Sequence, residues 1–282
     1  MSMRILLVGM SSFDSGKTTF AGLLIDEISH YSKSIEYFKP ISAHNYWQRF
    51  AHTQYCIEKK RLISADLATI KTKINSQIDD YLLNPIHRLY VPTASKKPLA
   101  ILPSTLSLAG PDSVIALQRF SWPEANRVRS MALVAEQLIG QGDLLLTKEQ
   151  LEHLIEGIEK RSVNSLEEIQ QYESENLESY VSSAFSRVED GTDILVIESF
   201  NDTAWIWEGL DMVNLVLVIG PGQVYRYEPE RFRKAAFLQK RPSMPIREVP
   251  FSRINDLIKP RSRDAWTPVG LETTEILTGI FE

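Results

Sequence analysis

The segment that most constrains the fold is the glycine-containing stretch Gly9–Thr19, which reads GMSSFDSGKTT. A compact apolar run, Met3–Val8, comes directly before it, and apolar residues recur at helical spacing in Thr19–Ile28, directly after it. A buried strand, a loop and a helix in this order form the opening unit of an α/β fold. The stretch therefore predicts an α/β protein with a doubly wound, mostly parallel sheet.

Further apolar segments are typical of strands in such a sheet. Ile35–Phe38 is followed by Lys39-Pro40, and the residue before a proline is disfavoured in helical geometry, so we expect the strand to stop there. Asp193–Glu198 and Asn214–Ile219 are nearly continuous apolar runs, which suit strands buried on both faces of a parallel sheet. Arg247–Pro250 is a candidate for one more strand near the carboxyl end.

Length and periodicity predict one domain with helical additions. A chain of 282 residues is long enough to bury a core that needs no disulfide or metal. We expect a single domain over 1–282, with helical insertions at about 42–82 and 124–180. The helices expected within these insertions are Leu62–Ile78, Ala125–Ile139, Lys148–Lys160 and Leu166–Tyr180.

Composition argues against several classes of protein. The net charge of −5 disfavours a general binder of nucleic acid, which usually carries a basic surplus. A single cysteine, Cys56, cannot form a disulfide within the chain. No apolar run approaches the roughly 20 residues of a membrane-spanning helix, and Ile5–Val8 is too short for a signal peptide. These features predict a cytoplasmic globular protein that does not bind membranes.

The glycine-containing stretch has the chemistry of a phosphate-binding loop. Successive backbone N–H groups and the N-terminus of the following helix form a concave site for anions. Lys17 is placed to reach the β- and γ-phosphates of a nucleotide, and the Thr18 hydroxyl is placed to bind Mg²⁺. The nucleotide-binding residues that we predict in the loop are Asp14, Ser15, Gly16, Lys17, Thr18 and Thr19.

The loop departs from the usual spacing at its start. The pattern G-x-x-x-x-G-K-[ST] places its first glycine at position 11, where this chain has Ser11, and Gly9 lies two residues earlier. Two explanations stay open. Either the loop is one or two residues longer than usual, or Ser11 adopts the backbone angles that glycine normally provides.

Several further motifs, together with the loop, resemble dethiobiotin synthetase and its relatives among the P-loop ATPases and GTPases of the SIMIBI type. That family has a lengthened loop ending in GKT, with an acidic residue two positions before the second glycine, as Asp14 is here. The other matching motifs, in chain order, are Tyr37-Phe38-Lys39-Pro40-Ile41, Ala65-Asp66, Asn84-Pro85-Ile86, Val196-Ile197-Glu198, Val218-Ile219-Gly220 and Glu248-Val249-Pro250. Their order and spacing over most of the chain carry the resemblance.

The resemblance implies a site and its cofactors. It implies ATP and Mg²⁺, with Thr18, Asp66 and Glu198 as oxygen ligands of the metal. Such ligands suit Mg²⁺, and we expect them to meet at the carboxyl edge of a parallel sheet, where open α/β folds bind ligands. It also implies that Lys39, with Lys17, is catalytic, because a positive charge beside a transferring phosphoryl group stabilises it. The nucleotide-binding positions that the resemblance adds are Val249 and Pro250, in a turn that contacts the base.

The chain departs from true dethiobiotin synthetases around the acceptor. Glu198 is followed by Ser199-Phe200-Asn201-Asp202 in place of a glycine-rich loop, and the insertion at 124–180 is longer than the family needs. We therefore expect a related nucleotide site with a different acceptor pocket, and not biotin synthesis. The candidates for lining that pocket are His44, Asn45, Tyr46 and Trp47, and the alternative is that Tyr46 and Trp47 pack an insertion onto the domain.

The sequence thus predicts an Mg²⁺- and ATP-dependent enzyme that transfers the γ-phosphoryl group to water or to a small acceptor, which the sequence does not identify. The alternative is a nucleotide-switched regulatory ATPase that binds a partner and forms a homodimer. Such switches often carry a second lysine early in the loop, whereas positions 10–13 are Met-Ser-Ser-Phe, which favours the enzyme. A polynucleotide acceptor would need a basic channel, which the composition does not indicate.

Overall fold

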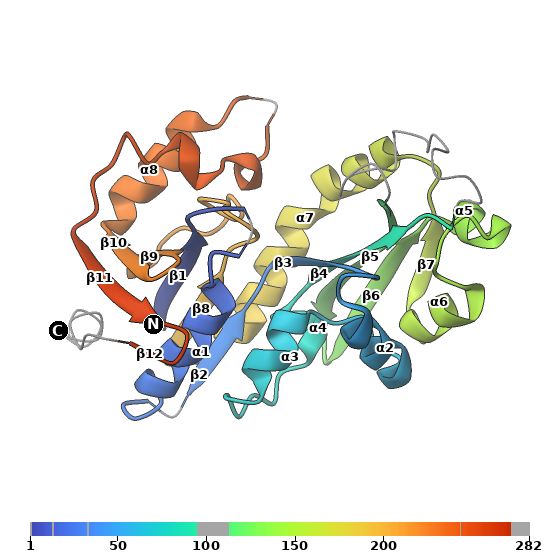
Figure 1. Cartoon of the computed structure of the whole chain (residues 1–282), viewed down its shortest axis with the longest axis horizontal. Helices are drawn as coiled ribbons and strands as arrows, with labels where there is room; N and C mark the ends of the chain where they lie inside the picture. The colour runs from blue at the N-terminus through green and yellow to red at the C-terminus, as the bar shows by residue number, and fades with distance from the viewer. Residues whose placement is uncertain (1, 13, 33, 95–112, 243, 272–282) are drawn as a thin grey trace. The chain divides into compact units, whose positions relative to one another are not determined.

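The computed structural model describes residues 2–12, 14–32, 34–94, 113–242 and 244–271. Over these residues the protein is α/β, with two mixed sheets and eight α-helices. The chain divides into two compact units (Figure 1). The first comprises Met1–Pro40, Asp66–Ile78 and Phe185–Glu282, and the second comprises Ile41–Ala65 and Asp79–Ala184. The chain therefore enters the second unit twice.

A seven-stranded sheet forms the core of the first unit, in the order β12-β11-β10-β9-β1-β8-β2. β1 pairs in parallel with β8 and β9, and β2 pairs in parallel with β8. The other three strands are antiparallel additions beside β9, so the sheet is mixed. The bounds are β1 Met3–Gly9, β2 Ile35–Phe38, β8 Ile194–Glu198, β9 Leu215–Gly220, β10 Gln223–Tyr227, β11 Ser262–Thr267 and β12 Gly270–Leu271.

The four parallel strands are those that the apolar runs predict. All residues of β8 and β9 are buried, as are the last five of β1. Strands covered on both faces need apolar side chains at successive positions, which is why they read as continuous apolar runs. The predicted strands at 35–38, 193–198 and 214–219 are confirmed, with boundaries that agree to within one residue.

The strand expected at Arg247–Pro250 is wrong. Ile246–Glu248 forms a 3-10 turn, η2, and Phe251–Arg253 forms a second one, η3. A proline, Pro245 or Pro250, immediately precedes each turn. Proline has a fixed φ and no N–H for a strand ladder, so this stretch keeps only one isolated bridge, between Pro250 and Thr203.

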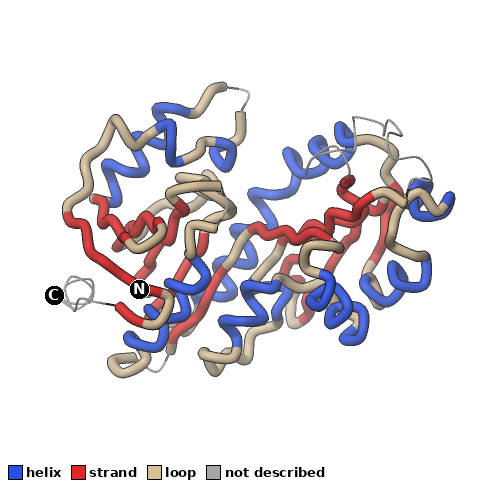
Figure 2. Tube along the Cα trace, viewed as in Figure 1, coloured by secondary structure: helices blue, strands red, loops and turns tan. Residues whose placement is uncertain are grey.

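The first unit contains the helices α1, α3 and α8. α1, Lys17–Ile28, packs against β1, β8 and β9 (Figure 2). α8, Pro229–Gln239, starts with proline, and the Glu228 side chain accepts hydrogen bonds from two backbone N–H groups of its first turn. α3, Ala65–Lys71, begins in the last residue of a second-unit segment and carries Asp66 in the first unit.

The second unit contains a five-stranded sheet in the order β3-β4-β5-β6-β7. The two outer pairs, β3 with β4 and β6 with β7, are parallel, and the two inner pairs are antiparallel. The strands are β3 Ile41–Asn45, β4 Ile86–Pro92, β5 Ser113–Glu124, β6 Arg127–Val134 and β7 Glu159–Ser162. The helices are α2 Phe50–Lys59, α4 Asp80–Leu83, α5 Glu136–Gln141, α6 Lys148–Leu154 and α7 Leu166–Glu189, whose last turn belongs to the first unit.

The insertions are less helical than predicted. The helix expected at Ala125–Ile139 is wrong, because Ala125 takes a positive φ of 51° in a two-residue turn and Arg127–Val134 pairs with β5. Cross-strand pairing thus overrides the helical propensity of these residues. The helix expected at Leu62–Ile78 forms only at Ala65–Lys71, and the one expected at Lys148–Lys160 ends at Leu154. The helix expected at Leu166–Tyr180 is present, within the longer α7.

The helices of the described ranges differ from membrane-spanning helices. None of them combines the length and the apolar character that crossing a bilayer requires.

Cys56 supplies a test of packing in the second unit. Its side chain lies fully buried in α2, and burial raises the pKa of the thiol to about 11. Because the thiolate is the reactive form, we expect Ellman's reagent at pH 8 to modify the native protein very slowly and the urea-unfolded protein at once. Absorbance at 412 nm measures both rates, and rapid modification of the native protein would contradict this packing.

Candidate functional site

The loop between β1 and α1 leads directly into a helix whose N-terminus has no side-chain cap. Gly16 is the N-cap residue of α1, and it takes the left-handed conformation with φ 83°. The first turn of α1 contains no acidic residue. The N–H groups of this turn and the positive end of the helix dipole therefore have no carboxylate of their own helix to satisfy them. This arrangement favours an anionic ligand.

The residues of this loop with a positive φ show whether Ser11 takes the place of the first glycine in the usual pattern. Positive φ values fall on Asp14, at 51°, and on Gly16, and not on Ser11. Ser11 thus does not supply glycine-like backbone angles. Gly9 is instead the last residue of β1, and a Cβ atom at this position would lie 2.7 Å from the Asn201 carbonyl oxygen and 2.9 Å from Lys17 Nζ. The close approach that requires glycine is therefore at the strand end.

Trp266, in β11, supports the loop at Gly16. A Cβ atom on Gly16 would lie 2.7 Å from Trp266 Cη2, so only glycine fits against the indole ring. The ring is fixed because its Nε1 donates hydrogen bonds to the carbonyl oxygens of Gly220, at 2.9 Å, and Gln223, at 3.1 Å. It also packs edge-on against Phe20 of α1, with ring centroids 5.5 Å apart. An antiparallel strand from the carboxyl-terminal part of the chain thus supports the loop.

Lys17 lies along the loop. Its Nζ donates a hydrogen bond to Ser15 Oγ at 3.3 Å and approaches Gly9 at the end of β1. Burial lowers the pKa of the Lys17 ammonium, and the negative charge of Glu198 opposes this shift only in part. Asp14 and Thr19, which we also predicted to bind nucleotide, are exposed at the two ends of this segment.

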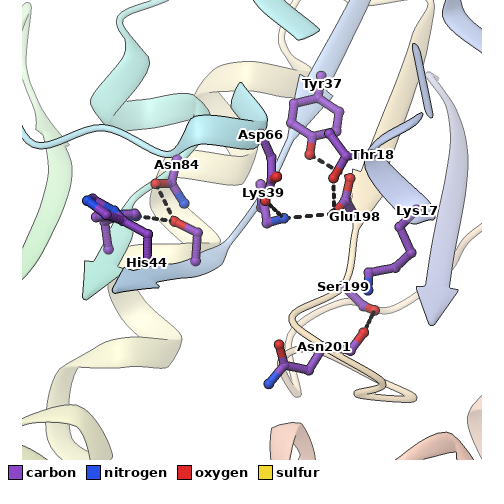
Figure 3. Close-up of polar contacts among 12 residues, drawn as sticks. Lys17, Thr18, Tyr37, Lys39, His44, Asp66, Asn84, Glu198, Ser199 and Asn201 are labelled. Atoms are coloured by element: carbon purple, nitrogen blue, oxygen red, sulfur yellow. Dashed lines mark hydrogen bonds and ion pairs between the residues drawn. The ribbon is translucent and has the colours of Figure 1, made fainter. Parts of the chain in front are cut away.

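Glu198 is the centre of a polar cluster at the carboxyl edge of the sheet (Figure 3). It ends β8, beside Leu7 of β1, so the ends of neighbouring parallel strands meet there. Glu198 Oε1 accepts hydrogen bonds from Thr18 Oγ1, at 3.1 Å, and from Lys39 Nζ, at 2.7 Å. Lys39 Nζ also forms an ion pair with Asp66. The structure therefore brings together Thr18, Lys39, Asp66 and Glu198, as the sequence predicted.

Burial and pairing set the charge states of this cluster. The side chains of Glu198 and Lys39 are 1% and 7% exposed, and that of Asp66 is 37% exposed. Burial by itself lowers the pKa of Lys39, but the attraction of Asp66 and Glu198 outweighs it, so the pKa is raised. Burial raises the pKa of Asp66, but Lys39 outweighs this effect and the pKa is lowered. Both groups are therefore charged at neutral pH.

Tyr37, which the sequence placed in the motif Tyr37–Ile41 without predicting a role for it in the site, is also a member of the cluster. Its hydroxyl donates a hydrogen bond of 2.7 Å to Glu198 Oε2, and both side chains are buried. Burial and the neighbouring Glu198 charge raise the pKa of Tyr37 well above its usual range. The signal was present, because Tyr37 lies two residues before Lys39 near the end of β2, and alternate residues of a strand face the same side.

The segment after Glu198 contacts the start of the loop between β1 and α1. Ser199 N donates to the Leu7 carbonyl at 2.9 Å, and Asn201 takes a positive φ of 50°. Ser12 Oγ donates a hydrogen bond of 3.0 Å to Asp202 Oδ1, which joins the loop to this segment directly.

Val249 and Pro250 contact that same segment. The Val249 carbonyl accepts from Ala204 N at 2.9 Å, and Phe251 N donates to the Asp202 carbonyl at 2.7 Å. The Val249 side chain is fully buried. These two predicted base-contacting residues therefore lie beside the segment that follows Glu198, and they also bond within their own turn, where Val249 N donates to the Ile246 carbonyl and the Pro250 carbonyl accepts from Arg253 N.

The residues proposed for an acceptor pocket all belong to the second unit, where their contacts lie. His44 is buried and hydrogen-bonds His87, at 2.7 Å, and Thr53 Oγ1, at 3.1 Å. Asn45 Oδ1 accepts from the backbone N–H of Trp47 and Gln48 before α2. Tyr46 is buried, whereas Trp47 is 66% exposed.

The oxygen donors fit Mg²⁺ that arrives with a nucleotide. Within the described ranges, no three His, Cys, Asp or Glu side chains are grouped to hold a metal by themselves. The carboxylates of Asp66 and Glu198 meet at the Lys39 ammonium instead, and the Thr18 hydroxyl bonds Glu198. Mg²⁺ is commonly bound through one or two carboxylates, water and the phosphates of a substrate, so this donor set is sufficient.

Comparison of the chain with protein-family models, with curated proteins and with solved structures found no match. The resemblance to dethiobiotin synthetase therefore stays a prediction from the motifs, and the geometry of the site carries the functional argument.

Gly16 provides a test of the loop support by Trp266. Gly16→Ala adds a clash with the indole ring to the strain of a positive φ, whereas Gly222→Ala, at φ 72° with open space around it, adds the strain alone. We expect Gly222→Ala to lose about 1 kcal/mol of unfolding free energy, and Gly16→Ala to lose a further ~1–3 kcal/mol. Urea unfolding measures both, and equal losses would mean that Trp266 yields to the added methyl group.

Tyr37 provides a test of the buried cluster. Tyr37→Phe removes the donor to Glu198 Oε2 and leaves a buried carboxylate oxygen without that bond, so we expect a loss of about 1.5–3 kcal/mol in unfolding free energy. The control is Tyr55→Phe, at a ring that is 41% exposed, for which we expect a change within about 0.5 kcal/mol. Urea unfolding followed by circular dichroism compares the two, and similar losses would count against the role of Tyr37.

Proposed function

We propose that the protein is an Mg²⁺- and ATP-dependent P-loop ATPase that transfers the γ-phosphoryl group to a small acceptor or to water. The observation that carries the proposal is the convergence of Thr18, Lys39, Asp66 and Glu198 beside the uncapped N-terminus of α1. The four parallel strands and the order strand, loop, helix support a doubly wound P-loop sheet as the framework. The antiparallel strands extend it at one edge.

The triphosphate is held by the loop and the start of α1. The backbone N–H groups of Ser15–Thr19 provide the cradle, and Lys17 provides a positive charge whose ammonium is already partly desolvated. Desolvation matters, because an ion pair with a phosphate is stronger where water does not screen it. Trp266 keeps the cradle in shape by packing on Gly16.

Thr18, Asp66 and Glu198 are the residues that would hold Mg²⁺, which supplies charge neutralisation of the phosphate oxygens. The Thr18 hydroxyl and Glu198 Oε1 are already within 3.1 Å of each other. Tyr37 holds the second oxygen of the same carboxylate, so Glu198 presents Oε1 in one orientation.

Lys39 is the residue that would stabilise charge on the transferring phosphoryl group. Its ammonium is fixed at the carboxyl edge of the sheet, beside the end of β2, and stays protonated. A positive charge held beside the transferring phosphoryl group stabilises the charge that develops in the transition state. The residues after Glu198 differ from a glycine-rich loop, which supports an acceptor other than that of dethiobiotin synthetase.

The test is binding of Mg²⁺–ATP to Lys17→Ala by isothermal titration calorimetry. Because a charged hydrogen bond to a phosphate is lost, we expect the dissociation constant to rise at least about 30-fold, which corresponds to ~2 kcal/mol. Lys234→Ala is the control, because it removes the same charge from an exposed ion pair with Glu230 in the same unit. Unchanged affinity of Lys17→Ala would overturn the proposal. ATP-dependent dimerisation without consumption of an acceptor would favour the regulatory alternative.

A further inference from the structure

Lys39 already occupies the carboxylates that we assign to the metal. Its Nζ bonds Glu198 Oε1 at 2.7 Å and forms an ion pair with Asp66. The hydroxyl of Thr18 bonds the same Glu198 oxygen. Both carboxylates of the proposed Mg²⁺ site therefore bind one ammonium group, a cation supplied by the chain itself, and the Thr18 hydroxyl bonds one of these carboxylates (Figure 3).

The Lys39 ammonium is held and does not swing freely. Phe38, the preceding residue, is fully buried and packs edge-on against Phe185 and Trp207, with ring centroids 5.6 and 5.9 Å away. Tyr37, one residue earlier, is bonded to Glu198. The end of β2 is thus fixed on both sides of the strand, and the Lys39 side chain is 7% exposed. It leaves the carboxylates only when other groups replace it there.

The charges of the cluster cancel without any added ion. Lys17 and Lys39 balance Asp66 and Glu198, and Asp202, which also acts on Lys17 and accepts a hydrogen bond from Ser12, lies outside this group of four and adds one negative charge beside it. A free divalent cation would therefore bring two positive charges next to two ammonium groups in a poorly hydrated site, which is unfavourable. The complex of Mg²⁺ with ATP is a net anion, and it brings its own phosphate ligands for Lys17 and the loop amides.

We propose that Lys39 acts as an internal counter-cation that closes the metal site to free divalent ions and makes metal binding depend on nucleotide. The proposal rests on the function proposed above and adds a specificity role for Lys39. On arrival of the metal–nucleotide complex, the carboxylates exchange the ammonium for the metal, and Lys39 becomes available to the phosphoryl oxygens. Lys39 thus excludes free divalent ions before the nucleotide binds and stabilises the charge of the phosphoryl group after it has bound.

The experiment measures binding of Mn²⁺, as the probe for Mg²⁺, to the nucleotide-free protein by electron paramagnetic resonance. Lys39→Gln removes the charge and keeps a hydrogen-bond donor toward the carboxylates, and Lys39→Arg keeps the charge. We expect the wild type and Lys39→Arg to bind Mn²⁺ weakly, and Lys39→Gln to bind it at least about 10-fold more tightly, because one like charge is removed from the site. Lys39→Gln combined with Glu198→Gln is expected to lose that gain.

Two outcomes would overturn the proposal: tight binding of Mn²⁺ by the nucleotide-free wild type, or Lys39→Gln binding no tighter than Lys39→Arg. If Lys39→Gln does not fold, the wild type still decides, because it must bind Mn²⁺ tightly only when a non-hydrolysable ATP analogue is present. A wild type that binds neither the analogue nor Mn²⁺ with it contradicts the proposed function itself. Binding of Mn²⁺ with equal affinity with and without the analogue contradicts only the role of Lys39.

Discussion

A carboxylate that is 1% exposed at the end of a buried strand must be surrounded by donors, because an unpaired buried charge costs several kcal/mol. Glu198 meets this requirement with Thr18, Tyr37 and Lys39. These donors come from α1 and from the end of β2, so satisfying one carboxylate brings both segments to one edge of the sheet. The position of Lys39, and through it that of Asp66, follows from the same requirement.

The loop between β1 and α1 has a second, independent support. Its glycine at the start of α1 is pressed against Trp266, which belongs to a strand more than two hundred residues later in the chain. The antiparallel strands β10–β12 therefore do not only extend the parallel core; they also position the loop. They fix the Trp266 indole ring beside the loop through two hydrogen bonds. A loop that is typical of parallel sheets is thus supported here by the antiparallel part of a mixed sheet.

Sequence patterns predicted those features that depend on a short stretch of residues or on the general geometry of parallel strands. Continuous apolar runs identified the parallel strands, and the predicted cluster of Thr18, Lys39, Asp66 and Glu198 assembled because strand ends meet at one edge. The hairpin at Ala125 was missed, because cross-strand pairing of Arg127–Val134 with β5 overrides the helical propensity of these residues. The contact of Trp266 with Gly16 could not be predicted either, since nothing near the tryptophan indicates which loop it supports.

The hydrogen bond between Thr18 and Glu198 joins residues that are 180 positions apart. β1 is flanked in the finished sheet by β8 and β9, and its pairing with β8 sets Met3 beside Ile194, so neither neighbour has been synthesised when β1 leaves the ribosome. Closing such a long loop is entropically slow. The apolar strand and its loop must therefore remain unpaired in the nascent chain for several seconds at ordinary translation rates of about 5–20 residues per second. β1 and the loop that follows it therefore reach their final surroundings only after β8 and β9 have been synthesised.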